Sequence, residues 1–404
     1  MEKTAAIAIL GTFDSKGDEH LFLKERIEKR GHTTLTVNVG IKNTLSFPVD
    51  VDLYSEMRKN RALSSQDRDK AIAAMISHAR ELVKNLYGKG ALSGIISAGG
   101  GSGTHLCTRV MQVLPLGIPK VMISTVASRD MAGIVGTKDI TMMHSVVDLL
   151  GINSVSGNVL DKAAAAICGM AESRWKPRHK KKRIALTFFG FITRAAEKVK
   201  ETLEKMDYEV VPFHANGTGG MAMVELASEG YFHGILDLAT HELADNLLNG
   251  YCGGIGSERY EPIPGKELPR LIVPGGMDCA VLEFTRNTVP EQYRDRKLFF
   301  YDFRSAIRLS KDETTHLAKQ LSEKLNMDAA NVHVLIPTRG FSDADRVDAP
   351  LYDPATGQIF IDTLKRNLDR LIEIQETDLH INDPAFGEQA ASLMDKLIKK
   401  AEAP

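Results

Sequence analysis

The chain has 404 residues, of which 43% are hydrophobic and 25% are charged. These proportions are typical of a folded globular protein, and at roughly 150 residues per domain the length favours two or three domains. The 51 Lys and Arg residues are balanced by 52 Asp and Glu residues, which leaves a net charge of −1. Without an excess of positive charge, nucleic acid is not expected to be the main partner.

The apolar segments and the cysteines indicate the cellular compartment in which the protein is expected. The apolar run at 5–10 is short and leads directly into the polar sequence GTFD, so we interpret it as a buried strand and not as a signal peptide. No run approaches the roughly 18 apolar residues that a membrane-spanning helix needs. Four cysteines are widely separated in the sequence: Cys107, Cys168, Cys252 and Cys279. We therefore expect a cytoplasmic protein with no membrane partner.

Strands and helices alternate through the first half of the chain. The apolar strand at 5–10 leads through a polar turn and a helix to an alternating β-branched strand at 34–39. A helix over 69–86 then precedes a strand at 92–97, and a Pro-bounded apolar strand follows at 117–125. This order predicts a parallel sheet covered by helices, in which ligands bind at the carboxyl ends of the strands.

The second half repeats this plan after a basic segment, RWKPRHKKKR, at 174–183. Its expected elements are a strand at 184–188, a helix at 195–206, a strand at 208–213, a helix at 221–229, a strand at 232–238 and a Pro-bounded strand at 267–275. A third region has a helix at 314–326, a strand at 332–336 and a helical tail from 359. We therefore predict two α/β domains, 1–177 and 178–404, joined by a basic linker that we interpret as solvated and not as a nucleic-acid patch.

The clearest candidate site is the glycine-rich sequence IISAGGGSGTHL at 95–106. Successive glycines let backbone N–H groups converge after a strand, and the helix that follows adds the positive end of its dipole, so the loop could hold a phosphate. Its candidate nucleotide-binding residues are Gly99, Gly100, Gly101, Ser102, Gly103 and Thr104. We expect φ > 0 at Gly101. The loop lacks the GK[ST] of a Walker motif, and a tight turn required by packing is the alternative.

The loop after the first strand, GTFDSKG at 11–17, would lie at the same edge of a doubly wound sheet. Asp14 could hold a ribose hydroxyl or a hydrated Mg²⁺, and Ser15 and Lys16 could contact phosphate oxygens. Capping of the following helix is the alternative for Asp14 and Ser15. The candidates in this loop are Gly11, Thr12, Asp14, Ser15 and Lys16. A third loop adds Thr125, Ser128 and Asp139 as further polar candidates.

The second half has a comparable turn, FHANGTGG at 213–220, which predicts a second anion site. Its candidate residues are Asn216, Gly217, Thr218, Gly219 and Gly220, with His214 beside them. The guanidinium of Arg339 could bind a carboxylate or phosphate group of a ligand through two hydrogen bonds. An acid/base or metal site could draw on His241, Glu242, Asp343, Asp345, His380 and Asp383, although turn chemistry also explains the Asn-Asp-Pro segment near the last two.

Seven motifs in this order resemble the tobamovirus-resistance-protein-like ATP-binding family: GTFDSKG, GGGSGT, IPKVMISTVAS, DITMMHSVVD, FHANGTGG, PTRGFSDAD and HINDPAF. The resemblance covers nearly the whole chain. It implies two Rossmann-like subdomains, a homodimer, and ATP with Mg²⁺ bound in the N-terminal subdomain. The resemblance also implies that the loops at 11–17 and 99–104 bind the ATP and that residues 125–128 lie next to it.

These observations leave the activity open between several classes. The first hypothesis is an ATP-using enzyme that takes a small anionic metabolite in a cleft between the domains, with His214, His241 and Arg339 as candidate catalytic groups. The second is a non-enzymatic nucleotide-dependent sensor or interaction module. A lyase or hydrolase centred on the second half is a further alternative. A nicotinamide-dependent enzyme is disfavoured because GxGxxG is missing after the first strand.

Overall fold

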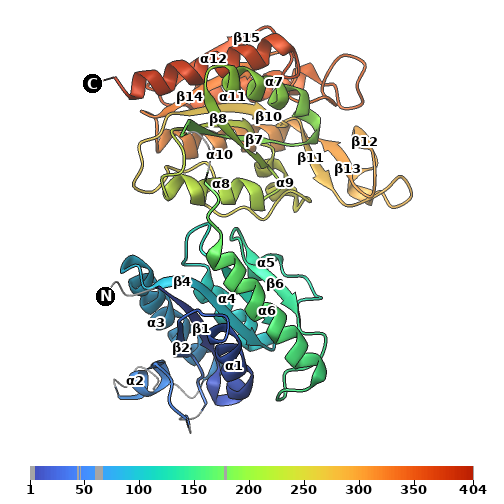
Figure 1. The fold of residues 1–404 in the computed structure, drawn as a ribbon. Coiled ribbons are helices and arrows are strands. Elements are labelled where there is room, and N and C mark those ends of the chain that lie inside the picture. Colours follow the sequence, from blue (N-terminus) through green and yellow to red (C-terminus); the bar gives the residue numbers. More distant parts are fainter. Residues whose placement is uncertain (1–4, 43–44, 46, 60–66, 177–179, 404) are drawn as a thin grey trace. The chain divides into compact units, whose positions relative to one another are not determined.

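The computed structural model describes residues 5–42, 45, 47–59, 67–176 and 180–403. The chain divides into two compact units, Met1–Lys176 and Pro177–Pro404. Each unit is built on a parallel sheet of six strands with helices on both faces (Figure 1), which confirms the predicted α/β doubly wound class. Residues 177–179 of the predicted basic linker lie outside the described residues.

The sheet of the N-terminal unit has the strand order β3-β2-β1-β4-β5-β6. Its strands are β1 (Ala6–Gly11), β2 (Thr34–Asn38), β3 (Val51–Asp52), β4 (Leu92–Gly99), β5 (Lys120–Ser124) and β6 (Thr141–His144). Its helices are α1 (Phe13–Glu28), α2 (Leu53–Lys59), α3 (Arg68–Gly88), α4 (Gly101–Met111), α5 (Ala132–Val135) and α6 (Ser154–Glu172). The central strands are continuous apolar runs because the sheet is buried on both faces.

Two hydrophobic layers hold this unit together. Helices α1 and α6 pack on one face of the sheet through Leu23, Ile27, Leu160 and Ile167, and helices α2, α3 and α4 cover the other face. The chain runs from β1 outward to β2 and β3 and then returns, so that β4 pairs with the opposite side of β1. The strand order therefore reverses between β1 and β4, and the loops after these two strands flank a crevice.

The sheet of the C-terminal unit has the order β15-β14-β10-β9-β7-β8, and a three-stranded antiparallel sheet, β11-β13-β12, extends from it. The strands are β7 (Lys182–Phe188), β8 (Tyr208–His214), β9 (Gly234–Ala239), β10 (Arg270–Gly275), β11 (Cys279–Leu282), β12 (Leu298–Phe300), β13 (Ser305–Arg308), β14 (Val332–Pro337) and β15 (Glu373–Thr377). The helices are η1 (Gly190–Ile192), α7 (Thr193–Lys205), α8 (Thr218–Ser228), α9 (Glu242–Leu248), η2 (Glu291–Tyr293), α10 (Lys311–Asn326), α11 (Pro354–Asn367) and α12 (Pro384–Ala401).

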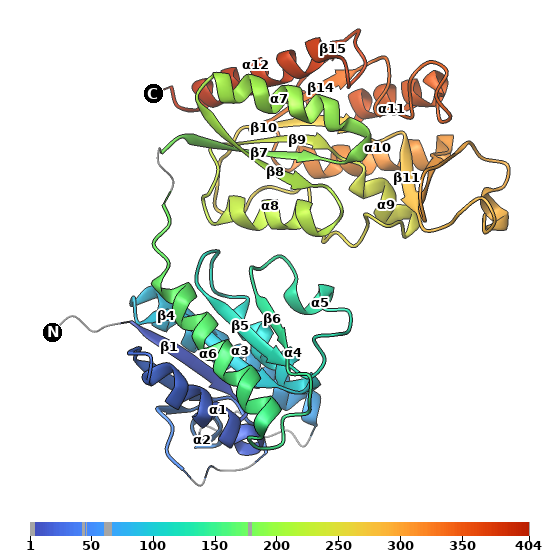
Figure 2. The ribbon, with the colours of Figure 1, turned by 45° about the vertical axis from the view of Figure 1, so that its right-hand side comes forward.

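Helices α7 and α12 cover one face of this second sheet, and α8, α10 and α11 cover the other (Figure 2). The order β8-β7-β9-β10 repeats the order β2-β1-β4-β5 of the first unit, so the two halves share a plan, as predicted. The reversal in the second unit lies between β7 and β9. In the described part of the chain, no helix is long and apolar enough to cross a membrane.

Candidate functional site

A pocket of about 310 Å³ opens at the reversal between β1 and β4. It brings together the two loops that the sequence identified, one after each of these strands. The predicted residues that line it are Thr12, Asp14, Ser15, Lys16, Gly100, Gly101, Ser102 and Gly103. Six further lining residues were not predicted: Val39, Ile41, Lys42, Arg68, Ile72 and Leu106.

The glycine-rich loop forms the N-terminus of helix α4. Gly100 precedes the helix with φ −79° and ψ −170°, and the helix begins at Gly101. Gly101 does not adopt the positive φ that we expected, so the loop owes its shape to a helix start and not to left-handed backbone. The first amides of a helix have no carbonyl partner within it, and they carry the positive end of the dipole. This end of α4 can therefore hold an anion.

The glycines in this loop differ in what surrounds them. A Cβ on Gly99 would lie 3.2 Å from the Cα of Gly103, so Gly99 allows the strand and the helix to approach closely. A Cβ on Gly101 or Gly103 would meet no atom within 4 Å in the described structure. The backbone at these two positions is therefore open toward the pocket, as a site for close approach of a ligand requires.

Positive charge dominates the polar lining of the pocket. Lys16, Lys42 and Arg68 contribute cations, and Asp14 contributes the one carboxylate among the lining side chains. The Lys16 ammonium donates a hydrogen bond to the carbonyl of Leu149. Asp14 accepts a hydrogen bond from the amide of Lys42 at 2.8 Å, which holds the segment after β2 against the loop after β1. An excess of two positive charges favours an anionic ligand.

His20 is a buried histidine that contacts the backbone of both loops of the pocket. The ring is fully buried, and its Nε2 accepts a long hydrogen bond, 3.4 Å, from the amide of Ala98 near the end of β4. Its Nδ1 lies 2.6 Å from the carbonyl of Lys16, where α1 departs from helical geometry. Because the Ala98 amide donates to Nε2, the ring carries its proton on Nδ1 and donates it to the Lys16 carbonyl, and burial lowers the pKa of His20. His20 thereby connects both loops of the pocket.

Five of the predicted nucleotide-binding residues lie outside the pocket lining: Gly11, Gly99, Thr104, Thr125 and Ser128. Thr104 is buried, and its hydroxyl lies 2.7 Å from that of Ser124, so it joins α4 to β5. The amide of Thr125 donates to the carbonyl of Gly99 at 3.1 Å. Ser128 is exposed in the next turn. Thr104 and Thr125 thus make hydrogen bonds that connect the elements around the site, and none of the five residues lines the pocket.

Asp139 lies at the opposite end of the sheet from the position expected of a ligand contact. Its carboxylate is 2.6 Å from the ammonium of Lys120, which begins β5 and is fully buried. The amide of Gly117 also donates to Asp139. Asp139 thus neutralises a buried lysine at the amino end of β5. For metals, the described residues contain no group of three or more His, Cys, Asp or Glu side chains placed to hold an ion.

The glycine turn of the second unit already binds a carboxylate of the chain itself. The amide of Gly217 donates to Oε1 of Glu242 at 2.7 Å, and a Cβ on Gly220 would lie 2.3 Å from Oε2 of the same residue. The amide of Gly219 donates to the side chain of Asn216. This turn follows the edge strand β8, whereas the first unit's glycine loop follows β4, whose counterpart is β9. The two turns are therefore not equivalent.

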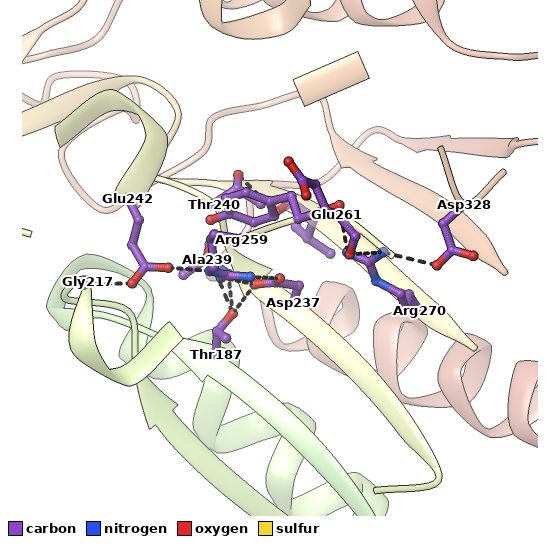
Figure 3. Close-up of polar contacts among 12 residues, drawn as sticks. Thr187, Gly217, Asp237, Ala239, Thr240, Glu242, Arg259, Glu261, Arg270 and Asp328 are labelled. Carbon is purple, nitrogen blue, oxygen red and sulfur yellow. Dashed lines mark hydrogen bonds and ion pairs between the residues drawn. The ribbon is translucent and has the colours of Figure 1, made fainter. Parts of the chain in front are cut away.

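Glu242 belongs to a buried ionic network that sequence reasoning missed (Figure 3). Arg259 donates through Nε to Glu242 at 2.8 Å and through Nη2 to Asp237 at 2.8 Å, and all three side chains are buried. Asp237 also accepts a hydrogen bond from the hydroxyl of Thr187 at 2.6 Å. The available signal was one aspartate, Asp237, inside the otherwise apolar strand at 234–239, because a charge within a buried strand requires a partner.

The three predicted catalytic residues have different surroundings. His241 is fully buried, its ring is stacked on Phe189 at 3.8 Å, and neither ring nitrogen has a hydrogen-bond partner in the described part of the chain. Burial lowers the pKa of His241 to about 3, with further effects from His214 and Arg259. Phe189 and His241 follow β7 and β9, so they occupy the reversal point of the second sheet.

His214 and Arg339 are more exposed than His241. His214 ends β8, and partial burial together with the charge of Arg304 lowers its pKa. Arg339 makes a two-pronged ion pair with Asp378 at the surface, with distances of 2.8 and 2.6 Å. Its guanidinium is thus engaged by the chain's own carboxylate, which is the kind of group that we expected a ligand to present.

Comparison with known proteins places both units in one family. Residues 5–176 match the N-terminal domain, and residues 181–398 match the C-terminal domain, of the uncharacterised protein family UPF0261. A UPF0261 protein of Clostridium tetani is 35% identical over 405 residues, which cover 98% of this chain and 99% of that protein. A UPF0261 protein of Rhizobium meliloti is 35% identical over 393 residues, 96% of this chain and 97% of its own length.

The tomato mosaic virus (ToMV) resistance protein Tm-1(GCR237) of Solanum lycopersicum is also related. It is 32% identical over 423 residues, which cover 96% of this chain and 55% of the tomato protein. The kinship with tobamovirus resistance proteins that we predicted from the motifs is therefore confirmed. ATP binding, which the same resemblance implied, stays a prediction.

Proposed function

We propose, for a chain that belongs to the uncharacterised protein family UPF0261, that the N-terminal unit binds ATP in the pocket between the loops after β1 and β4. One observation carries this proposal. Two loops that are about 85 residues apart in the sequence meet at the reversal of a parallel sheet, and one of them is a helix N-terminus with open glycines. This is where mononucleotides bind in doubly wound folds.

The division of the lining into charged and apolar parts supports a nucleotide in preference to a simple phosphate. The first amides of α4, together with Lys42 and Arg68, would hold the phosphates. The apolar side chains of Ile41, Ile72 and Leu106 would cover the base. Asp14, which also lines the pocket, would accept a hydrogen bond from a ribose hydroxyl.

Mg²⁺ would enter with the phosphates. Asp14 is the carboxylate of the lining that could contact Mg²⁺, directly or through water. It also accepts the hydrogen bond from the Lys42 amide. Mg²⁺ often keeps several waters and is held by one or two carboxylates plus substrate phosphates, so a site of this composition suits a nucleotide-borne ion. The metal would neutralise phosphate charge and fix the geometry of the phosphate chain.

The experiment that tests this proposal is isothermal titration of the full chain with ATP in the presence of Mg²⁺. Saturable binding is expected, and binding should be lost when Lys42 and Arg68 are both replaced by Met. Arg109, an exposed arginine near the other end of α4, provides a matched control as Arg109→Met. No saturable heat with the wild-type chain, or equal loss in the control, would contradict the assignment.

Mass analysis of the nucleotide after incubation separates the two classes of activity. Recovery of intact ATP would favour a sensor or interaction module, whereas ADP or AMP would identify an enzyme. Homodimer formation, a cytoplasmic location and a second, anionic ligand in the C-terminal unit stay predictions. The second ligand would have to use donors other than the Gly217 amide, because Glu242 already accepts from that group.

A further inference from the structure

A second cavity, of about 600 Å³, lies in the C-terminal unit, and its lining shares no residue with the proposed ATP pocket. One wall comes from the loop after β7 and from strand β12 with its following turn, and the other wall comes from the loop after β14. Both β7 and β14 end at the carboxyl edge of the sheet, the edge at which parallel α/β sheets bind ligands. The volume lies within the range of small-molecule sites.

Three aromatic rings form the first wall. Phe191, Phe299 and Tyr301 contact one another with ring centroids 5.4 to 5.7 Å apart. Such tilted and edge-on contacts stabilise each ring in its place. Tyr301 is nevertheless 37% exposed, so part of this aromatic surface faces solvent at the cavity.

The second wall is a loop, residues 343–350, that is held from beneath. The buried guanidinium of Arg308 lies 2.6 Å from Asp345 and also donates to the carbonyl of Leu351. The amide of Asp343 donates to the carbonyl of Phe191 at 2.9 Å, which joins the two walls. The cavity is therefore preorganised by buried contacts and does not depend on a ligand for its shape.

The charges that line the cavity leave an excess of negative charge. Asp343 pairs weakly with Arg346, at 3.7 Å, and Asp348 at the exposed part of the loop has no ion-pair partner in the described structure. A further cation outside the lining, Arg304, lies over the ring of Tyr301 at 5.3 Å, and Asp302 balances its charge at 2.7 Å. The lining side chains, with two carboxylates and one guanidinium, therefore carry a net charge of −1.

We propose that this cavity binds a small organic cation of the ammonium type. Aromatic faces attract ammonium groups through the ring quadrupole, and a carboxylate without a partner supplies the opposite charge. An anion would be repelled by Asp343 and Asp348, and a neutral apolar ligand would gain no attraction from either carboxylate. The aromatic rings and the excess of negative charge thus favour the same class of ligand. Its charge is opposite to that of the ATP proposed for the other unit.

Choline is a suitable probe because a neutral analogue of nearly the same shape, 3,3-dimethyl-1-butanol, differs from it by one atom and the charge. The experiment is isothermal titration of the full chain with each compound without nucleotide. Saturable binding of choline is expected, and the neutral analogue should bind about tenfold more weakly or not at all. Absence of saturable choline binding, or equal binding of the two compounds, would overturn the proposal.

Variants locate the binding. Asp348→Asn and Phe299→Leu should each weaken choline binding by about fivefold or more, while Phe299→Tyr should retain it, since a tyrosine ring also attracts cations. Phe303→Leu is the control, because Phe303 is an exposed ring of the same turn that does not line the cavity. Thermal unfolding verifies that each variant is folded. An equal loss in Phe303→Leu, or unchanged binding in Asp348→Asn, would place the cation elsewhere and refute the site.

Discussion

Gly11 and His20 are in such close contact that no side chain can be added between them. A Cβ on Gly11 would lie 2.2 Å from Nε2 of His20 and 2.4 Å from two carbons of the ring. The ring cannot withdraw without losing the hydrogen bonds to Lys16 and Ala98. The last residue of β1 is therefore required to be glycine by the histidine that supports the pocket.

Replacing Gly11 by Ala should lower the free energy of unfolding by roughly 1–3 kcal/mol, because the added methyl group overpacks a buried contact. Denaturant unfolding monitored by circular dichroism measures the change. Gly88→Ala provides the control, since a Cβ at Gly88 meets no atom within 4 Å in the described structure and its φ is not positive. Equal stability of the Gly11 and Gly88 variants would show that the His20 contact is not rigid.

Gly101→Val should abolish ATP binding while leaving the fold intact. The backbone of Gly101 is helical, so the valine causes no backbone strain and acts by placing its methyl groups in the open space of the pocket. Titration calorimetry measures the affinity. Gly169→Val is the matched control, because Gly169 is an exposed glycine of helix α6 that also has open space around it. Unchanged ATP affinity in a folded Gly101→Val chain would remove α4 from the site.

Arg259→Met should be strongly destabilising, by about 3–5 kcal/mol, because it leaves the carboxylates of Asp237 and Glu242 buried without a counter-charge. The comparison is with Arg339→Met, which breaks a pair of similar geometry with Asp378 at the surface. That change should leave the midpoint of denaturation within experimental error, because water screens and solvates the freed groups. Similar losses from both substitutions would contradict the role of burial.

The stability of the protein should depend on pH through Asp245. Burial raises the pKa of this carboxyl to about 8, although the amides of Cys252 and Val281 donate to it. An unfolded Asp has a pKa of about 3.9, so between roughly pH 4 and 8 the folded chain holds a proton that the unfolded chain releases. The free energy of unfolding therefore falls as the pH rises through this range.

Asp245→Asn isolates this effect, since the amide resembles the protonated carboxyl in shape and charge. The difference in unfolding free energy between the variant and the wild type should grow in favour of the variant from pH 5 to pH 8. The slope can reach about 1.4 kcal/mol per pH unit for one proton. A difference that does not change with pH would show that Asp245 is ionised in the folded chain.

The general architecture could be predicted because alternating strands and helices permit few arrangements. The meeting of the loops after β1 and β4 at one edge of the sheet followed from this rule, whereas the strand order itself was not predicted. The antiparallel sheet β11-β13-β12 was missed, since strands of three or four residues carry almost no periodic signal. The region from α10 onward, which we described as a third region, instead extends the second sheet through β14 and β15.

The polar residues of the two strand-to-helix loops were predictable, whereas Lys42, Arg68 and the apolar part of the pocket lining were not. Glycines and an Asp-Ser-Lys sequence after a strand are recognisable in isolation. Ile41 and Lys42 enter the pocket because β2 pairs with β1, and Ile72 enters because the start of α3 packs beside α4. Such positions depend on tertiary packing and resemble ordinary core residues in the sequence. Glu242 was named as an acid/base or metal candidate, but its contact with the Gly217 amide was not predicted, because it also depends on tertiary packing.

The stack of Phe189 on His241 has a consequence for stoichiometry. Although four strands have the same order in both sheets, these rings fill the second reversal point, and a Cβ on Gly276 would lie 2.6 Å from the Phe189 ring and 2.8 Å from the Cβ of His241. A chain with two equivalent crevices would bind two nucleotides per chain in a calorimetric titration. This one is expected to reach saturation at a molar ratio of one, however many chains associate.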